Sequence, residues 1–452
     1  MSNINKEKRL GSERMLPLIL RMALPCVAAQ LINLLYNIVD RIFIGHIPEV
    51  GTEALAGVGV TASVIILIMS FANMVGMGGA PLASIALGEG DHERASKILG
   101  NGTVMLVFFA IVCSLITYMF MEPILLATGA SEATLGYAME YLSIYLIGSI
   151  FVLISLGLNT FITLQGRPGV AMFAVAIGAI ANIILDYILI FPCNMGVAGA
   201  AYASVVSQGI TAAITLYFLI SHKASLRIRL QDLKPNRQII LLTLSLGISP
   251  FIMSSTEALI GFVLNGSLKA YGDIHISAMA ILQSALLVAS TPITGFTQGM
   301  MPIISYNYGS GNKQRIKDCV RISMIIVATF NFMFISAMIV FPEITASLFT
   351  NDTELIAKVG EVMPVFFLGM TLFGIQRVCQ SSFIALKQVK ISIFIAMLRK
   401  IILLIPLALI LPKWLDVMGI YWAETIADAT AATCCSVIFY FIFRRVMREI
   451  KS

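Results

Sequence analysis

Acidic side chains inside long apolar segments are the residues of this sequence that could carry chemistry. In the first half they are Asp40, in LLYNIVDRIFIG, and Asp186, in ANIILDYILIF. A charge at the centre of a bilayer costs about 2.5 to 3.5 kcal/mol, so an acid at that depth indicates an ion or proton site. Asn182 lies four residues before Asp186 and shares its helical face, at about 6 Å. A carboxamide beside a carboxylate suits a small cation or a shared proton.

Ser204 is expected at the same depth as the two acids. The spans that carry Asp40 and Asp186 are expected to run outward, and the span that carries Ser204 runs back inward. Neighbouring carboxylates favour one proton retained between them, which suits a proton-coupled switch. Two other interpretations stay open, because Asp186 could point at the outer headgroups and Asp40 could pair with Arg41.

The second half carries a different set of ionisable residues at membrane depth. They are Glu257, Arg399, Lys400, Glu424 and Asp428. Two bases beside three acids predict a buried ion-pair network, because unpaired charges would be far more costly. A structural clamp and a coupling or substrate site are equally open for this network. Glu257 is favoured as functional because its own expected span, 238–268, carries no base.

Motifs of metal centres and of intramembrane enzymes are missing from the sequence. The seven cysteines form no CxxC pair, and the four histidines fall in loops or at the ends of spans. Neither DDxxD nor HExxH occurs. We therefore expect a protein that is not an enzyme, with no metal and no cofactor, whose only co-reactant is a coupling ion, H⁺ or Na⁺.

The acids stand in a sequence that is built for the bilayer. Of its 452 residues 58% are hydrophobic and 12% are charged, which a single soluble core cannot absorb. Each crossing needs about 20 apolar residues. An all-α integral membrane protein with twelve spans is predicted, near 16–44, 54–86, 96–120, 135–164, 169–191, 197–220, 238–268, 276–307, 316–341, 356–386, 390–411 and 417–443.

The longest polar stretch after the N-terminus divides these spans into two sets of six. It predicts an N-terminal lobe over 1–220, a cytoplasmic linker over 221–237 and a C-terminal lobe over 238–452. Most of the 30 Lys and Arg residues fall in the termini, the linker and the loops of the same face. The positive-inside rule places that face, with both termini, in the cytoplasm of a multi-pass protein of the plasma membrane. The net charge of +6 therefore reflects orientation and not a nucleic-acid partner.

The two halves repeat each other. GMGGAPLASIALGEGDHER reads against FTQGMMPIISYNYGSGNKQR, and one constant offset relates Gly78 to Gly299 and Gly88 to Gly309. Parallel repeats of this kind are typical of secondary transporters and disfavour a channel. The acids are not repeated, since Leu404 and Ala408 stand where Asn182 and Asp186 would be.

An ordered set of segments resembles the MATE multidrug exporters, within a wider superfamily of lipid and drug exporters. The segments are LLYNIVDRIFIG, LGEGDHERASKILGN, GLNTFITLQGRP, NIILDYILIF and GVAGAAYASVVSQ, then GISPFIM, YNYGSGNKQR, LRKIILLIPLALILP and GIYWAETIAD. The resemblance implies two pseudo-symmetric six-helix lobes that form a V and alternate between inward-open and outward-open states. It also implies export of amphipathic, often cationic, drugs by a monomer embedded in membrane lipid, driven by inward H⁺ or Na⁺.

The resemblance also implies roles for single residues. Cation or proton coupling falls to Asp40, Asn182, Asp186, Ser204 and Glu257, and substrate contact to Asn33, Tyr36 and Asn159. The acid that accompanies Glu257 in some members is missing, because LFGIQRVCQ offers only Gln376 and Arg377. This departure favours the acids of the first half. A flippase for lipid-linked precursors, from the same superfamily, is the alternative; such proteins typically have a more cationic central cavity.

Overall fold

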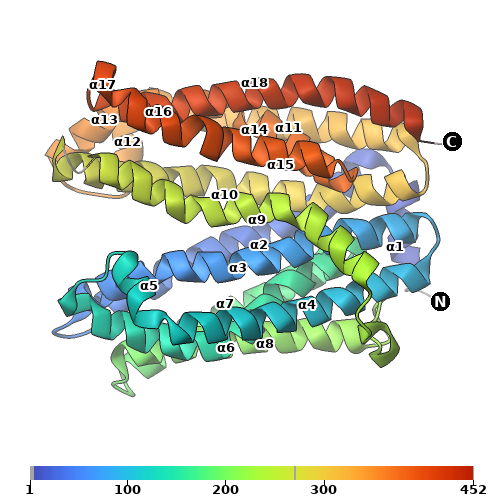
Figure 1. Ribbon diagram of the computed structural model, residues 1–452, viewed down its shortest axis with the longest axis horizontal. Helices are drawn as coiled ribbons and strands as arrows, with labels where there is room; N and C mark the ends of the chain where they lie inside the picture. The colour runs from blue at the N-terminus through green and yellow to red at the C-terminus, as the bar shows by residue number, and fades with distance from the viewer. Residues whose placement is uncertain (1–4, 269–270, 451–452) are drawn as a thin grey trace.

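The protein is a bundle of long helices joined by short loops (Figure 1). The computed structural model describes residues 5–268 and 271–450. Within these ranges eleven helices are long and apolar enough to cross a membrane, and a bent pair of helices makes up to twelve. The predicted all-α membrane fold is therefore confirmed.

The helices begin and end close to the predicted boundaries. Those of the first half are α1 (Asn5–Ser12), α2 (Met15–Gly45), α3 (Gly51–Gly88), α4 (His92–Met119), α5 (Met121–Ala127), α6 (Glu132–Leu164), α7 (Pro168–Ile190) and α8 (Gly196–Ile220). Those that follow are η1 (Leu230–Leu233), α9 (Arg237–Leu268), α10 (Asp273–Gly309), α11 (Lys313–Val340), α12 (Pro342–Ser347), α13 (Thr353–Phe367), η3 (Gly369–Leu372) and α14 (Phe373–Ala385). The last are α15 (Val389–Met397), η4 (Leu398–Leu404), α16 (Ile405–Ile410), α17 (Pro412–Leu415) and α18 (Met418–Glu449).

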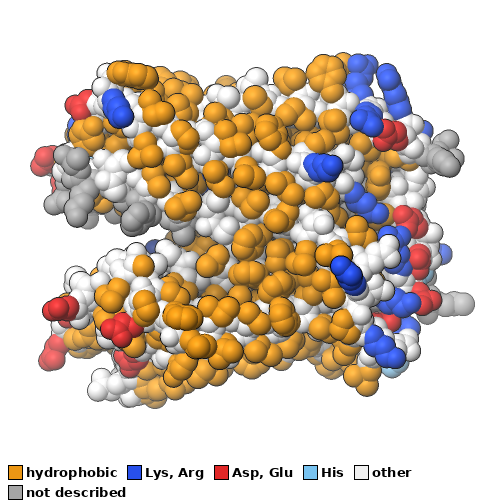
Figure 2. All heavy atoms as spheres, in the orientation of Figure 1, with side chains coloured by type: hydrophobic (Ala, Val, Ile, Leu, Met, Phe, Trp, Pro, Cys, Tyr) orange, Lys and Arg blue, Asp and Glu red, His pale blue; other side chains and the backbone are white. Residues whose placement is uncertain are grey.

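The helices form two groups, α2 to α8 and α9 to α18, which we call the first and the second group (Figure 1). They meet through α10, which packs on α2 and α3, and through α9, which packs on α3. The surface is notched between the groups at the face opposite the chain termini, whereas Lys and Arg gather at the face of the termini (Figure 2). The molecule is therefore closed at one face and open at the other.

Glycines at equivalent positions of the two sequence repeats make equivalent contacts between the two groups. Gly78 of α3 lies against the backbone of Thr243 in α9, and its counterpart Gly299 of α10 lies against the backbone of Ala23 in α2. A Cβ at either glycine would collide with that backbone. The small residues thus allow α3 and α10 to approach the opposite group closely, as in other membrane helix interfaces.

A second pair of glycines at equivalent positions of the repeat lies where the two groups meet, at the face that carries the chain termini. A Cβ at Gly88 would collide with the carbonyl oxygen of Tyr306, and one at Gly309 with that of Ile85. The helices that follow begin alike, because Asp91 and Asn312 accept hydrogen bonds from backbone N–H groups three residues later, at 2.9 and 3.2 Å. The repeat in the sequence therefore corresponds to a repeat in the structure.

The segment between the groups is fixed to the first group by amide side chains. Gln165 accepts hydrogen bonds from the backbone N–H groups of Ser225 and Leu226, at 2.8 and 3.0 Å. Asn101 accepts one from the N–H of Asn236, at 2.7 Å. These bonds satisfy backbone donors that have no helical partner.

One predicted span, 356–386, is bent instead of straight. Helices α13 and α14 meet at an angle of 44° across η3. Pro364 weakens α13 shortly before the break because it has no N–H to donate. Asn331 donates to the carbonyl groups of Met370 and Thr371, at 2.8 Å each, and Thr425 donates to those at the end of α13. A break inside a membrane is tolerated when such partners satisfy the freed backbone.

Candidate functional site

The two acids of the first half meet inside the first group. The carboxyl groups of Asp40 on α2 and Asp186 on α7 lie within hydrogen-bonding reach of each other. Asp186 is fully buried and Asp40 is 9% exposed. No ion pair joins either acid to a base, Arg41 included, within the parts of the chain that the structure describes. Asp186 is therefore not a headgroup-facing carboxylate.

Polar atoms of the acid pair and of Asn182 lack hydrogen-bond partners among the described residues. Both carboxylate oxygens of Asp186, one of Asp40 and both polar atoms of the Asn182 side chain are buried without a hydrogen-bond partner among the described residues. Buried polar groups are almost always paired. Two carboxylates this close satisfy each other only when a proton or a cation lies between them. The acid pair thus has buried oxygens that no described protein donor satisfies.

Tyrosines and an amide surround the acids. Tyr141 of α6 lies beside Ser204 and within electrostatic range of both acids, which places Ser204 near the pair. Gln208 donates to the hydroxyl of Tyr36 at 3.5 Å and accepts from Ser155 at 2.8 Å. Sequence reasoning missed Tyr141 and Gln208. The tyrosines of YAMEYLSIY recur every four residues and so share one helical face, a pattern that could have pointed to Tyr141.

A cavity opens beside the acid pair, between α2, α3, α6, α7 and α8. It holds about 1230 Å³ of space, its open mouth included. Most of its lining is apolar, with Met69, Met77, Met172 and Met301 among it. Methionine side chains adapt to varied apolar ligands.

The predicted substrate residues line this cavity. Asn33, Tyr36 and Asn159 are among its walls, together with Asn182. Asp40 stands one helical turn beyond Tyr36 on α2, and Asp186 one turn beyond Asn182 on α7. A change at the acid pair therefore reaches the cavity through two helices at once.

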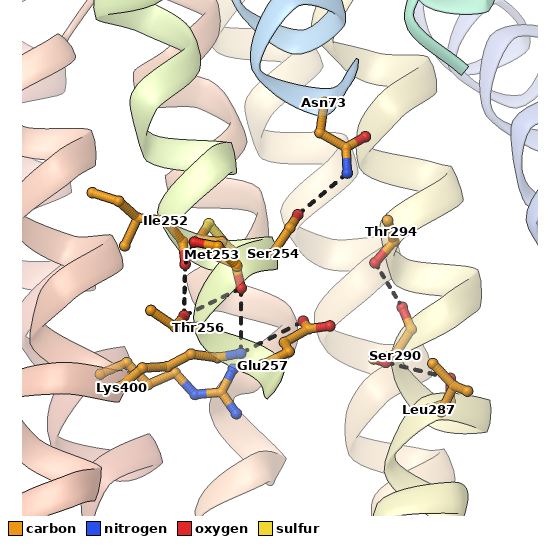
Figure 3. A network of polar contacts seen from close by, with 12 residues as sticks. Asn73, Ile252, Met253, Ser254, Thr256, Glu257, Leu287, Ser290, Thr294 and Lys400 are labelled. Carbon is orange, nitrogen blue, oxygen red and sulfur yellow. Dashed lines mark hydrogen bonds and ion pairs between the residues drawn. The ribbon is translucent and has the colours of Figure 1, made fainter. Parts of the chain in front are cut away.

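Two polar bridges join the groups at this cavity. Gln30 of α2 donates to Gln298 of α10 at 3.0 Å, and both line the cavity. Asn73 of α3, another lining residue, donates to Ser254 of α9 at 3.2 Å (Figure 3). The cavity of the first group is thus closed in part by the second group.

Glu257 lies apart from the other predicted coupling residues. It belongs to α9, its side chain is 63% exposed, and Lys400 is its ion-pair partner at 3.5 Å (Figure 3). Arg399 pairs with Asp428 and, at 3.4 Å, with Glu424. The ion-pair network predicted for the second half is therefore confirmed. Across residues 5–268 and 271–450, no group of three or more His, Cys, Asp and Glu side chains could hold a metal ion.

Known transporters resemble the chain over nearly its whole length. The sequence model of the MatE family matches residues 25–188 and 250–410, one segment in each half. The multidrug export protein MepA of Staphylococcus haemolyticus (strain JCSC1435) is 24% identical over 427 residues, with 94% of both chains covered. MepA of Staphylococcus aureus (strain NCTC 8325 / PS 47) is 25% identical with the same coverage.

Solved structures share the fold. One shows the outward-facing conformation of a multidrug resistance MATE family transporter of the MOP superfamily, and another shows a MATE protein in the bent conformation. Both superpose with a TM-score of 0.91 over 99% of each chain, at 19% and 20% identity respectively. The predictions of a MATE fold and of a transporter instead of an enzyme are confirmed. Because the family model covers more than half of the chain, this protein belongs to the MatE family of membrane transporters.

Proposed function

We propose that this protein exports amphipathic, often cationic, drug-like molecules in exchange for H⁺ or Na⁺. One observation carries the proposal: a buried pair of acids, Asp40 and Asp186, has no described base within ion-pair distance and adjoins a large, mostly apolar cavity. The MepA relatives, which are multidrug export proteins, support the same substrate class.

The acid pair acts as the coupling site in this proposal. When a proton or Na⁺ binds between the carboxylates, their repulsion disappears and α2 and α7 approach each other at their outer ends. Tyr36 and Asn182, one turn away, move with these helices and change the cavity wall. A bound drug then loses contacts and leaves. Loss of the cation restores the repulsion and the drug-binding shape.

Other predicted residues have supporting roles. Asn33, Tyr36 and Asn159 orient polar groups of the drug while the methionines contact its apolar part. Ser204 holds Tyr141 beside the acids. Glu257 stays a sequence-based prediction of a coupling acid in the second half.

The two groups act as the lobes of an alternating-access transporter, the first with residues 1–220 and the second with 238–452, joined by 221–237. The positive-inside rule supports cytoplasmic termini, because Lys and Arg gather at that face (Figure 2). The notch at the other face then makes this the outward-open state. Opening inward requires the Gly88 and Gly309 contacts and the bridge between Gln30 and Gln298 to separate.

Ethidium transport into inside-out vesicles tests the proposal. A ΔpH and a ΔNa⁺ are imposed separately on vesicles with the wild type, Asp40→Asn, Asp186→Asn and, as a matched control, Glu140→Gln, an exposed acid of the same group. One gradient should drive uptake by the wild type and the control, and neither gradient should drive it in the two Asp variants. Unimpaired, gradient-driven uptake by both Asp variants would contradict coupling through the acid pair.

A further inference from the structure

A second pocket lies in the second group, between α9, α14, α15 and η4, and its charged lining is wholly cationic. It is shallow, and the space of about 310 Å³ that it offers includes its open mouth. Arg377, Arg399 and Lys400 line it, and no acidic side chain does. Its remaining walls are apolar or carry amides, as at Phe373 and Gln376.

The acids that balance two of these bases lie outside the pocket. Arg399 pairs with Asp428 and Glu424 of α18, neither of which lines the pocket. Lys400 reaches from η4 toward α9, where Glu257 lies 3.5 Å away and is mostly exposed (Figure 3). The two bases therefore line the pocket, while the acids that pair with them do not.

Arg377 is the third base, and it forms no ion pair with a described residue. It donates one hydrogen bond, to the hydroxyl of Thr294 at 3.2 Å, and its Nε is buried without a partner. No acid lies within ion-pair distance of it in the described ranges. Its guanidinium and that of Arg399 lie 5.8 and 4.9 Å from the centre of the same ring, Phe373. A partly buried base at membrane depth with no acid within ion-pair distance is costly, so the site favours an added anion.

The local backbone aims two bases into one pocket. Arg399 and Lys400 follow each other in η4, a π-helical segment that ends just before Pro406. Such wide turns inside helices occur mostly at functional sites. Consecutive residues of an ordinary α-helix point about 100° apart, yet both of these side chains line the pocket.

We propose that this pocket binds an anionic amphiphile through its carboxylate or phosphate group. Arg377 and Lys400 hold the anion, and Phe373 and Ile395 pack against the apolar part. Glu257 is the internal anion that the ligand displaces from Lys400. This site is separate from the drug cavity and from the acid pair, so it does not depend on the function proposed above.

The pocket adjoins the contact between the two groups. Met253 lines it, and the next residue, Ser254, accepts the hydrogen bond of Asn73 from the first group (Figure 3). Asn73 also lines the drug cavity. An occupant of the pocket therefore lies two side chains away from the drug cavity.

Binding to the purified full-length protein in neutral detergent tests the proposal. Decanoate is the probe for a free acid and dioleoyl phosphatidic acid is the probe for a lipid headgroup, with decanol and phosphatidylcholine as uncharged references. Thermophoresis gives the Kd for the wild type, Arg377→Gln, Arg377→Lys, Glu257→Gln and the exposed control Lys97→Gln. Thermal unfolding without ligand verifies that each variant is folded.

We expect saturable binding of at least one anionic probe, about tenfold weaker in Arg377→Gln because a charge-assisted hydrogen bond is lost. Arg377→Lys should be intermediate, since it keeps the charge without the planar fork. Glu257→Gln should bind more tightly than the wild type, and Lys97→Gln should match it. Saturation by decanoate alone assigns a free acid, and saturation by phosphatidic acid alone assigns a lipid. No saturable binding, or equal Kd values in the wild type and Arg377→Gln, would overturn the proposal.

Discussion

The two groups bury charge in opposite ways. The first group encloses two acids with no described base within ion-pair distance, and under the proposed function its site is completed by a cation from outside. The second group encloses bases together with acids, and Arg399 is neutralised within the protein by Asp428 and Glu424. Under the proposed function an exchangeable cation occupies the first arrangement, whereas in the second one acids of the protein itself neutralise the base.

The scaffold is repeated although the charges are not. Gly88 and Gly309 make equivalent contacts, and Asp91 and Asn312 cap equivalent helices. At the positions that carry chemistry the halves differ, because the buried Ala408 stands where the repeat would place Asp186. The repeat thus preserves how the groups meet and lets each half acquire its own charged residues.

Removing the base of the second network should have the largest effect on stability. Arg399→Gln leaves Asp428 and Glu424 buried without a counter-ion, which costs about 3 to 5 kcal/mol of unfolding free energy. Equilibrium unfolding in mixed micelles measures this loss. Arg445→Gln removes the base of an exposed ion pair and is the matched control, with no measurable change expected. Equal stability of both variants would contradict the comparison.

Placing an unpaired acid in the second group should have the next largest effect. Ala408→Asp buries a carboxylate at a position where the first group has one, and the expected loss is about 2.5 to 3.5 kcal/mol. Ala408→Asn tests the effect of size without charge in the same unfolding assay. If the Asp and Asn variants unfold alike, charge does not distinguish the two halves at this position.

The glycine contacts should show where the halves are equivalent. Gly88→Ala and Gly309→Ala each force a methyl group against a carbonyl of the opposite group, at about 1 to 3 kcal/mol. Gly59→Ala on α3 meets no atom within 4 Å and should stabilise the helix by up to about 1 kcal/mol. Mixed-micelle unfolding should give similar losses for the first two variants; a large difference between them would contradict the repeat symmetry.

Neutralising the acid pair should have the smallest effect on stability. Asp186→Asn removes a buried carboxylate that has no protein donor, so the unfolding free energy should stay within about 1 kcal/mol of the wild type or rise. The same unfolding assay compares it with Arg399→Gln. A loss as large as that of Arg399→Gln would mean that the acids of the first group are structural.

Sequence predicts the spans because length and apolar composition decide which segments cross a bilayer. The bend at η3 escaped prediction although Pro364 is visible in the sequence. Its stability depends on Asn331 and Thr425, which lie on other helices and satisfy the carbonyl groups of the break. Such long-range partners leave no local pattern to detect.

The candidate site was predictable only in part, for the same reason. Asp40 and Asp186 stand out because acids are rare in apolar spans, and the direction of the spans indicates that they meet. Tyr141 and Gln208 do not stand out, since both residue types are ordinary in membrane helices. The lack of a counter-ion at Arg377 follows only from the helices that surround it.

Cation release by the purified protein tests most directly whether the coupling site lies in the first group. A pH-sensitive dye and a Na⁺ electrode follow the release of H⁺ and Na⁺ when ethidium is added to the wild type, Asp186→Asn and Glu257→Gln. We predict release of one of these cations by the wild type and by Glu257→Gln, and none by Asp186→Asn. Release by Asp186→Asn together with its loss in Glu257→Gln would contradict the account and place coupling in the second group.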